Sequence, residues 1–197
     1  MAFTIGIVAF DDAEELDFVG PWEVFTMAAQ ANGTDKVVLI AERAEPVRCA
    51  KGLRVLPDHT FGDAPPLDVV LVPGGIGTRR EMDNPALLSW LREAGARCQW
   101  VTSVCTGALV LQRAGFLTDR RATTHWSVLD ALRELGGVTV LSERRYVRDG
   151  NVVTAAGVSA GIDMALWLVG QLHDPDFARS VQRFMEYDPS PPYAAAV

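Results

Sequence analysis

The sequence predicts an α/β fold that is built on a mainly parallel central sheet. Short apolar runs recur along the chain, and longer stretches with helical periodicity separate them. Three of these runs, residues 3–10, 68–72 and 99–104, hold almost no charge, which is typical of strands that helices cover on both faces. The length of 197 residues suits one core, so we expect a single domain over residues 1–197.

Turn and capping residues place the elements of the first half of the chain. Pro21 is a residue type that favours the first turn of a helix, and Gly33 suits the C-terminal stop of that helix. Asn84 and Pro85 form the same kind of start. In order, we expect a strand at 3–10, a helix from Pro21 to about residue 31, a strand at 36–41, a hairpin over 47–56, a strand at 68–72 and a helix over 85–96.

The second half of the chain continues the alternation. Gly136 and Gly137 are expected to end a helix, and Asp149-Gly150-Asn151 is expected to join two short strands. In order, we expect a strand at 99–104, helices over 106–114 and 127–135, short strands at 138–141, 145–147 and 152–155, helices over 160–172 and 175–185, and an extended tail over 188–197.

Charge and cysteine content exclude several classes of protein. The 18 Lys and Arg stand against 25 Asp and Glu, and this net charge of −7 argues against a nucleic-acid partner. The three cysteines include no C-x-x-C pair and the three histidines are dispersed, so we expect neither a disulfide framework nor a metal site. The sequence shows no signal peptide and no apolar run of bilayer length, so we expect a cytoplasmic protein without a membrane partner.

The most informative segment is Ser103-Val-Cys105-Thr-Gly107, which lies between a predicted strand and a predicted helix. Its spacing of small residue, nucleophile and glycine is typical of a nucleophile elbow, a tight turn that pushes one side chain into the open. The N-terminus of the following helix would favour the thiolate of Cys105. Cys49 and Cys98 lack this context, and we interpret them as structural thiols.

Two further strand ends bring polar groups to the same edge of the sheet, where ligands of such folds bind. Asp17 stands between apolar residues, either as a helix cap or as a proton donor whose pKa burial raises. Gly74 and Gly75 offer backbone N–H groups that could hold an oxyanion. His125 is either a base or orienting donor, or a structural side chain, and no Cys-His-acid order is recognisable.

Five motifs occur in one order along the chain. They are Leu16-Asp17-Phe-Val-Gly-Pro21, Val72-Pro-Gly-Gly75, Thr102-Ser-Val-Cys-Thr-Gly107, Ala122-Thr-Thr-His-Trp126 and Gly157-Val-Ser-Ala-Gly-Ile-Asp163. In this set the sequence resembles the DJ-1/PfpI superfamily, and within it the isonitrile hydratase branch. The resemblance runs from Ile5 to about Tyr193.

The resemblance implies a flavodoxin-like three-layer sandwich of the kind that class I glutamine amidotransferases share. It also implies a homodimer with active sites near its interface, and no cofactor. The roles that it implies are Cys105 as nucleophile, Asp17 as general acid and base, and Thr106 as a polar neighbour of the thiol. We expect the oxyanion and a small-molecule substrate to be bound by Gly74, Gly75, His125 and Trp126.

The implied activity is the hydration of isonitriles to N-substituted formamides through a covalent thioimidate on Cys105. Thr106 stands where protease-like and glyoxalase-like members commonly have His, and Asp17 stands where many members have Glu, so both of those interpretations are weakened. Regulators of the superfamily carry a helix–turn–helix after this domain, and none follows Tyr193, which disfavours a DNA-binding regulator. Two alternatives stay open: redox or ligand sensing through Cys105, and glyoxalase or hydrolase activity on another small electrophile.

Overall fold

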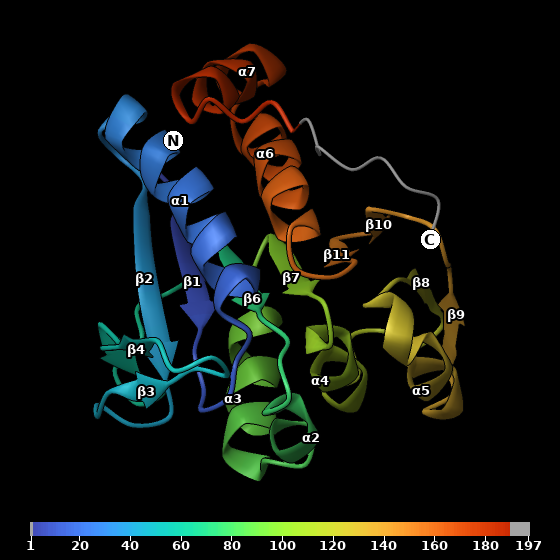
Figure 1. Ribbon diagram of the computed structural model, residues 1–197. Helices are drawn as coiled ribbons and strands as arrows, with labels where there is room; N and C mark the ends of the chain where they lie inside the picture. The colour runs from blue at the N-terminus through green and yellow to red at the C-terminus, as the bar shows by residue number, and fades with distance from the viewer. Residues whose placement is uncertain (1, 190–197) are drawn as a thin grey trace.

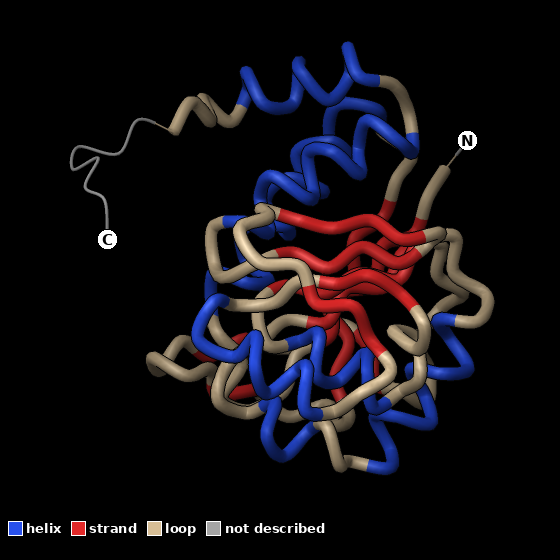
Figure 2. Tube along the Cα trace, turned by 90° about the vertical axis from the view of Figure 1, so that its right-hand side faces the viewer, coloured by secondary structure: helices blue, strands red, loops and turns tan. Residues whose placement is uncertain are grey.

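The computed structural model describes residues 2–189 and is built around a seven-stranded sheet. Figures 1 and 2 show helices on both faces of this sheet. Helices α1 (Glu15–Asn32), α6 (Ala160–Leu172) and α7 (Pro175–Phe184) pack together on one face, and α3 (Pro85–Gly95) and α4 (Gly107–Arg113) cover the other. The predicted α/β sandwich is therefore confirmed.

The strands of this sheet lie in the order β10-β11-β7-β6-β1-β2-β5, and only β10 is antiparallel to its neighbour. The chain places β2 on one side of β1 and β6 on the other, so the strand order reverses at β1. In open α/β sheets such a reversal leaves a crevice at the carboxyl ends of the strands, where ligands bind. The strands are β1 (Thr4–Val8), β2 (Lys36–Ala41), β5 (His59–Thr60), β6 (Val69–Val72), β7 (Trp100–Val104), β10 (Tyr146–Asp149) and β11 (Val152–Ala155).

Helix α1 departs from the prediction at its start. It begins at Glu15 rather than at Pro21, so Pro21 lies inside the helix and cannot donate a hydrogen bond to the carbonyl of Asp17. The loss is tolerated because Pro21 is buried against α6, where a side chain added at Gly161 would meet its ring at 3.1 Å. The predicted stop is confirmed: Gly33 has a φ of 68° and its N–H donates to the carbonyl of Ala29 at 2.8 Å.

The remaining predicted elements form within a few residues of their expected bounds. Three short elements were not predicted: β5, β8 and α2. The expected helix over 127–135 is divided into a 3₁₀ turn and α5, and residues 190–197 of the expected tail lie outside the described residues. These other elements are β3 (Val47–Arg48), β4 (Arg54–Val55), α2 (Thr78–Glu81), β8 (Arg120–Ala122), the 3₁₀ turn (Trp126–Val128), α5 (Leu129–Glu134) and β9 (Val138–Val140).

The core is one continuous cluster of apolar side chains on both faces of the sheet. Strands β1, β6, β7 and β11 are buried almost throughout, which explains their apolar sequences. Among residues 2–189, no helix is both long enough and apolar enough to cross a membrane. The rigid sheet thus fixes where the loops at its carboxyl edge stand.

Candidate active site

Cys105 occupies a tight turn between β7 and α4. It is a non-glycine residue with a φ of 56°, in the left-handed region that side chains disfavour. Its N–H donates to the carbonyls of Ala155, the last residue of β11, and Ala156, at 3.2 and 2.9 Å. Two residues on, a Cβ added at Gly107 would lie 2.2 Å from the carbonyl oxygen of Val72, so α4 can pack this closely only with glycine there. The segment therefore has the geometry of a nucleophile elbow.

Asp17 is fully buried in the first turn of α1, inside the helix rather than ahead of it. Its Oδ2 accepts a hydrogen bond from the N–H of Gly74 at 2.9 Å, while its Oδ1 has no hydrogen-bond partner among the described residues. Burial raises the pKa of Asp17 from 3.8 to about 7, against the Gly74 N–H, which lowers it, and with the charge of Glu14, which raises it. Near neutral pH this carboxyl can therefore both give and take a proton.

The Cys105 thiol lies beside that carboxyl and is itself only 7% exposed. Burial and then the charge of Asp17 raise the pKa of Cys105 to about 12, while the backbone N–H groups of Thr106 and Val158 act in the opposite direction. The sequence led us to expect a thiolate favoured by the helix N-terminus. Removal from water outweighs that effect, so the resting thiol holds its proton and Asp17 is the group that can receive it.

The predicted oxyanion donors already have partners. Besides the bond from Gly74 to Asp17, the N–H of Gly75 donates to Thr106 Oγ1 at 3.0 Å. Thr106 Oγ1 also lies 3.0 Å from the buried hydroxyl of Thr78, which donates to the carbonyl of Gly75 at 2.7 Å. In this arrangement the two glycine N–H groups position the carboxyl and Thr106 instead of facing an open site.

The predicted site residues His125 and Trp126 make their contacts with other residues than this pair. The His125 ring accepts a hydrogen bond from the N–H of Ser127 at 3.3 Å and packs where a Cβ at Gly157 would stand, 2.1 Å from its Cδ2. Both His125 and Trp126 line an open cavity of about 400 Å³, and Trp126 is 78% exposed. Cys105 and Asp17 do not line this cavity, and no hydrogen bond joins His125 or Trp126 to either of them among the described residues.

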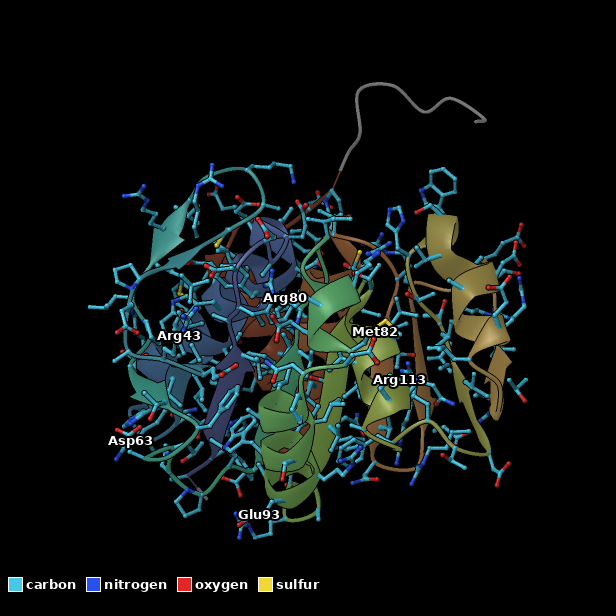
Figure 3. The ribbon with its side chains drawn as sticks, turned by 90° about the horizontal axis from the view of Figure 1, so that it is seen from below. Arg43, Asp63, Arg80, Met82, Glu93 and Arg113 are labelled. Carbon is cyan, nitrogen blue, oxygen red and sulfur yellow. The ribbon has the colours of Figure 1, made fainter. Side chains whose placement is uncertain are left out.

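A second cavity, of about 460 Å³, opens at the carboxyl ends of β1 and β2. Arg43 and Arg80 are among the residues that line it, and both are labelled in Figure 3, a view from below. Neither Cys105 nor Asp17 lines this cavity, so its size does not make it the reactive centre. Residues 2–189 contain no group of three or more His, Cys, Asp or Glu side chains that could hold a metal ion.

Two residues of the site were not predicted. Val158 is a β-branched residue with a φ of 52°, and its N–H faces the thiol. Thr124 donates from its buried hydroxyl to the carbonyl of Cys105 at 2.7 Å. Both stand within the motifs noted above, but each meets Cys105 only through the tertiary fold. Cys49 and Cys98 are also buried, and burial raises their pKa values to about 11 and about 12.

The sequence and the fold are similar to those of known proteins. A model of the DJ-1/PfpI family matches residues 4–171. The chain belongs to the DJ-1/PfpI family. One relative, the isonitrile hydratase of Pseudomonas putida, is 42% identical over 193 residues, which cover 98% of this chain and 82% of the relative.

Two further proteins are similar to this chain. The HTH-type transcriptional regulator GbdR of Pseudomonas aeruginosa is 27% identical over 187 residues, 94% of this chain but 51% of the regulator. The crystal structure of a THiJ/PfpI family protein from Pseudomonas syringae superposes with a TM-score of 0.91 at 36% identity, covering 100% of this chain and 80% of that one.

Proposed function

We propose that this chain is an isonitrile hydratase, a lyase that adds water to an isonitrile and releases an N-substituted formamide without a cofactor. The observation that carries the proposal is the buried pair of Asp17 and Cys105, in which a carboxyl with a pKa of about 7 keeps one oxygen unpartnered beside a thiol. The 42% identity to the Pseudomonas putida isonitrile hydratase supports the substrate class.

The first step joins the thiol to the terminal carbon of the isonitrile. That carbon accepts both a nucleophile and a proton, so the sulfur of Cys105 forms the C–S bond while the thiol proton passes through Asp17 to the same carbon. The N–H groups of Thr106 and Val158 favour the sulfur while it carries negative charge. The product is a covalent thioimidate, and Asp17 is left as a carboxylate.

The second step consumes one water molecule. Asp17 takes a proton from the water as the water oxygen attacks the thioimidate carbon, and it passes this proton to the nitrogen. The C–S bond of the tetrahedral intermediate then breaks, its hydroxyl proton passes to the leaving sulfur of Cys105, and the formamide is released with Asp17 again a carboxylate. Atoms balance as one isonitrile plus one water to one formamide, with no change of oxidation state in the protein.

The proton count of the pair sets the pH dependence. The reactive form carries one transferable proton between Asp17 and Cys105, whereas the form with both groups protonated has no base. The rate constant kcat/KM should therefore rise with pH through the Asp17 pKa of about 7 and then level off.

The redox-sensor alternative requires an accessible thiol with a low pKa. Cys105 is buried and its pKa is raised, which favours the hydratase over a sensor. A glyoxalase or hydrolase acting on another small electrophile would use the same pair. Its test is consumption of methylglyoxal that depends on Cys105.

The decisive experiment follows formamide formation from an aryl isonitrile. Wild type should turn over, Cys105→Ala should be inactive, and Asp17→Asn should lose on the order of 100-fold or more because no group can relay the proton. Cys98→Ala removes another buried thiol and should keep wild-type kcat. Absence of turnover by wild type, or turnover by Cys105→Ala, would contradict the proposal.

A further inference from the structure

Three buried threonines stand behind the elbow. Thr123, Thr124 and Thr154 are each at most 2% exposed. The hydroxyl of Thr154, on β11, accepts a hydrogen bond from the N–H of Thr123 at 2.8 Å, which ties the segment after β8 to the central sheet. The next hydroxyl along, that of Thr124, donates to the carbonyl of Cys105 at 2.7 Å.

This arrangement holds the peptide units of Cys105 from two directions. The N–H of Cys105 donates to the carbonyls of Ala155 and Ala156 at the end of β11, and its carbonyl accepts from Thr124, whose neighbour Thr123 is bound by Thr154 on the same strand. Cys105 itself has a φ of 56°, a backbone conformation that is unfavourable for a non-glycine residue and persists only where the surrounding structure enforces it. The contacts with β11 hold the N–H of Cys105, and the hydrogen bond from Thr124 holds its carbonyl.

The direction of the thiol depends on that backbone conformation. If the φ of Cys105 changed to an ordinary negative value, the sulfur would move relative to the N–H groups of Thr106 and Val158, which favour its negative charge. It would also move relative to the unpartnered Oδ1 of Asp17. A shift on the order of 1 Å at reacting atoms is enough to cost about 100-fold in rate.

We propose that Thr124 is a positioning residue, which locks the elbow through its hydrogen bond to the Cys105 carbonyl and so keeps the thiol aimed at its proton partner. The expected effect of Thr124 on turnover rests on the proposed function. Its expected effect on the reactivity of the Cys105 thiol does not, because alkylation of a cysteine requires no isonitrile chemistry.

The test compares Thr124→Val with Thr124→Ser and with a matched control, Thr102→Val. Thr102 is also fully buried and donates from its hydroxyl to a backbone carbonyl, that of Val70, at 3.0 Å, so the control loses the same kind of bond. Two readouts are made: kcat and KM with an aryl isonitrile, and the rate of Cys105 carbamidomethylation by iodoacetamide at about pH 8, followed by peptide mass spectrometry. Urea unfolding of each variant gives the folded fraction.

We expect Thr124→Val to lose about 10-fold or more in kcat with little change in KM, and to react several-fold more slowly with iodoacetamide. Thr124→Ser should restore both, and Thr102→Val should match wild type in both while losing comparable stability. An alkylation rate in Thr124→Val that is equal to or faster than that in Thr102→Val would contradict the proposal that Thr124 positions Cys105. If the wild type turns over no isonitrile, the proposed function fails and the alkylation rates alone decide the role of Thr124.

Discussion

The burial of Asp17 should cost stability, and replacing it with asparagine should reveal how much. In the folded protein its pKa is about 7, against 3.8 for the exposed group. Between these values the folded chain holds a proton that the unfolded chain has lost, so the free energy of unfolding falls as pH rises through this window. The gap of about three pH units corresponds to about 4 kcal/mol once the pH exceeds 7.

Asp17→Asn removes the ionisation but keeps an oxygen that can accept the bond from Gly74. Any cost of the new amide is independent of pH, so the readout is the difference between variant and wild type as a function of pH. From about pH 4.5 to about pH 8.5 this difference should move by about 3 kcal/mol in favour of the variant. In urea titrations read by tryptophan fluorescence, that is a relative midpoint shift of about 1.5 M.

A control of opposite sign is available at the surface. The carboxylate of Asp63 accepts hydrogen bonds from the N–H and hydroxyl of Thr60, both at 2.6 Å, and these bonds lower its pKa. Its stabilising effect is present at neutral pH and is lost as pH falls through the acidic range, so Asp63→Asn should lose ground to wild type as pH rises. A stability difference between Asp17→Asn and wild type that is flat across the range would refute a buried carboxyl with a raised pKa.

Three further outcomes are expected. The Cβ of Gly107→Ala would lie 2.2 Å from a backbone oxygen, so this variant should lose about 1–3 kcal/mol or more in its free energy of unfolding in urea. Gly62→Ala is the control, because the nearest atom to its Cβ lies at 3.7 Å, and its free energy of unfolding should stay within about 1 kcal/mol of wild type. Equal losses in the two variants would contradict the close-packing explanation. Glu14→Gln should move the rise of the pH–rate profile to lower pH, because the charge of Glu14 raises the pKa of Asp17. Lys51→Met should move this rise to higher pH, because Lys51 pairs with Glu14 and offsets its charge. Shifts of both variants in the same direction would contradict this electrostatic explanation. Sedimentation equilibrium should give about twice the mass of one chain, as the family resemblance implies, and a monomer at micromolar concentration would contradict the expected homodimer.

The elements that the sequence predicts best are those bounded by strong local signals. The strand β2 and the helix α6 have the predicted bounds because turn residues close an apolar run on each side. The predicted start of α1 is wrong because proline favours the first turn of a helix, whereas packing of Pro21 against α6 places it inside the helix. Strands β5 and β8 escape prediction because they are short and partly charged.

In the candidate site, too, local patterns are predictable from the sequence and long-range contacts are not. The elbow at Cys105 is visible because all its requirements fall within five consecutive residues. The use of the Gly74 N–H by Asp17 joins residues 57 positions apart, and the bond from Thr124 to the elbow spans 19. No local pattern reports such pairs, since the fold alone brings them into contact.

That dispersal has a consequence for the newly made chain. The ribosome synthesises the site residues at widely separated times, in the order Asp17, Gly74, Cys105 and Val158. In the unfolded chain the carboxyl and the thiol are exposed to water, have ordinary pKa values near 3.8 and 9.0, and are not held within reach of each other. The chemistry is thus switched on only by completion of the fold, and the onset of activity during refolding should coincide with the last cooperative step rather than precede it.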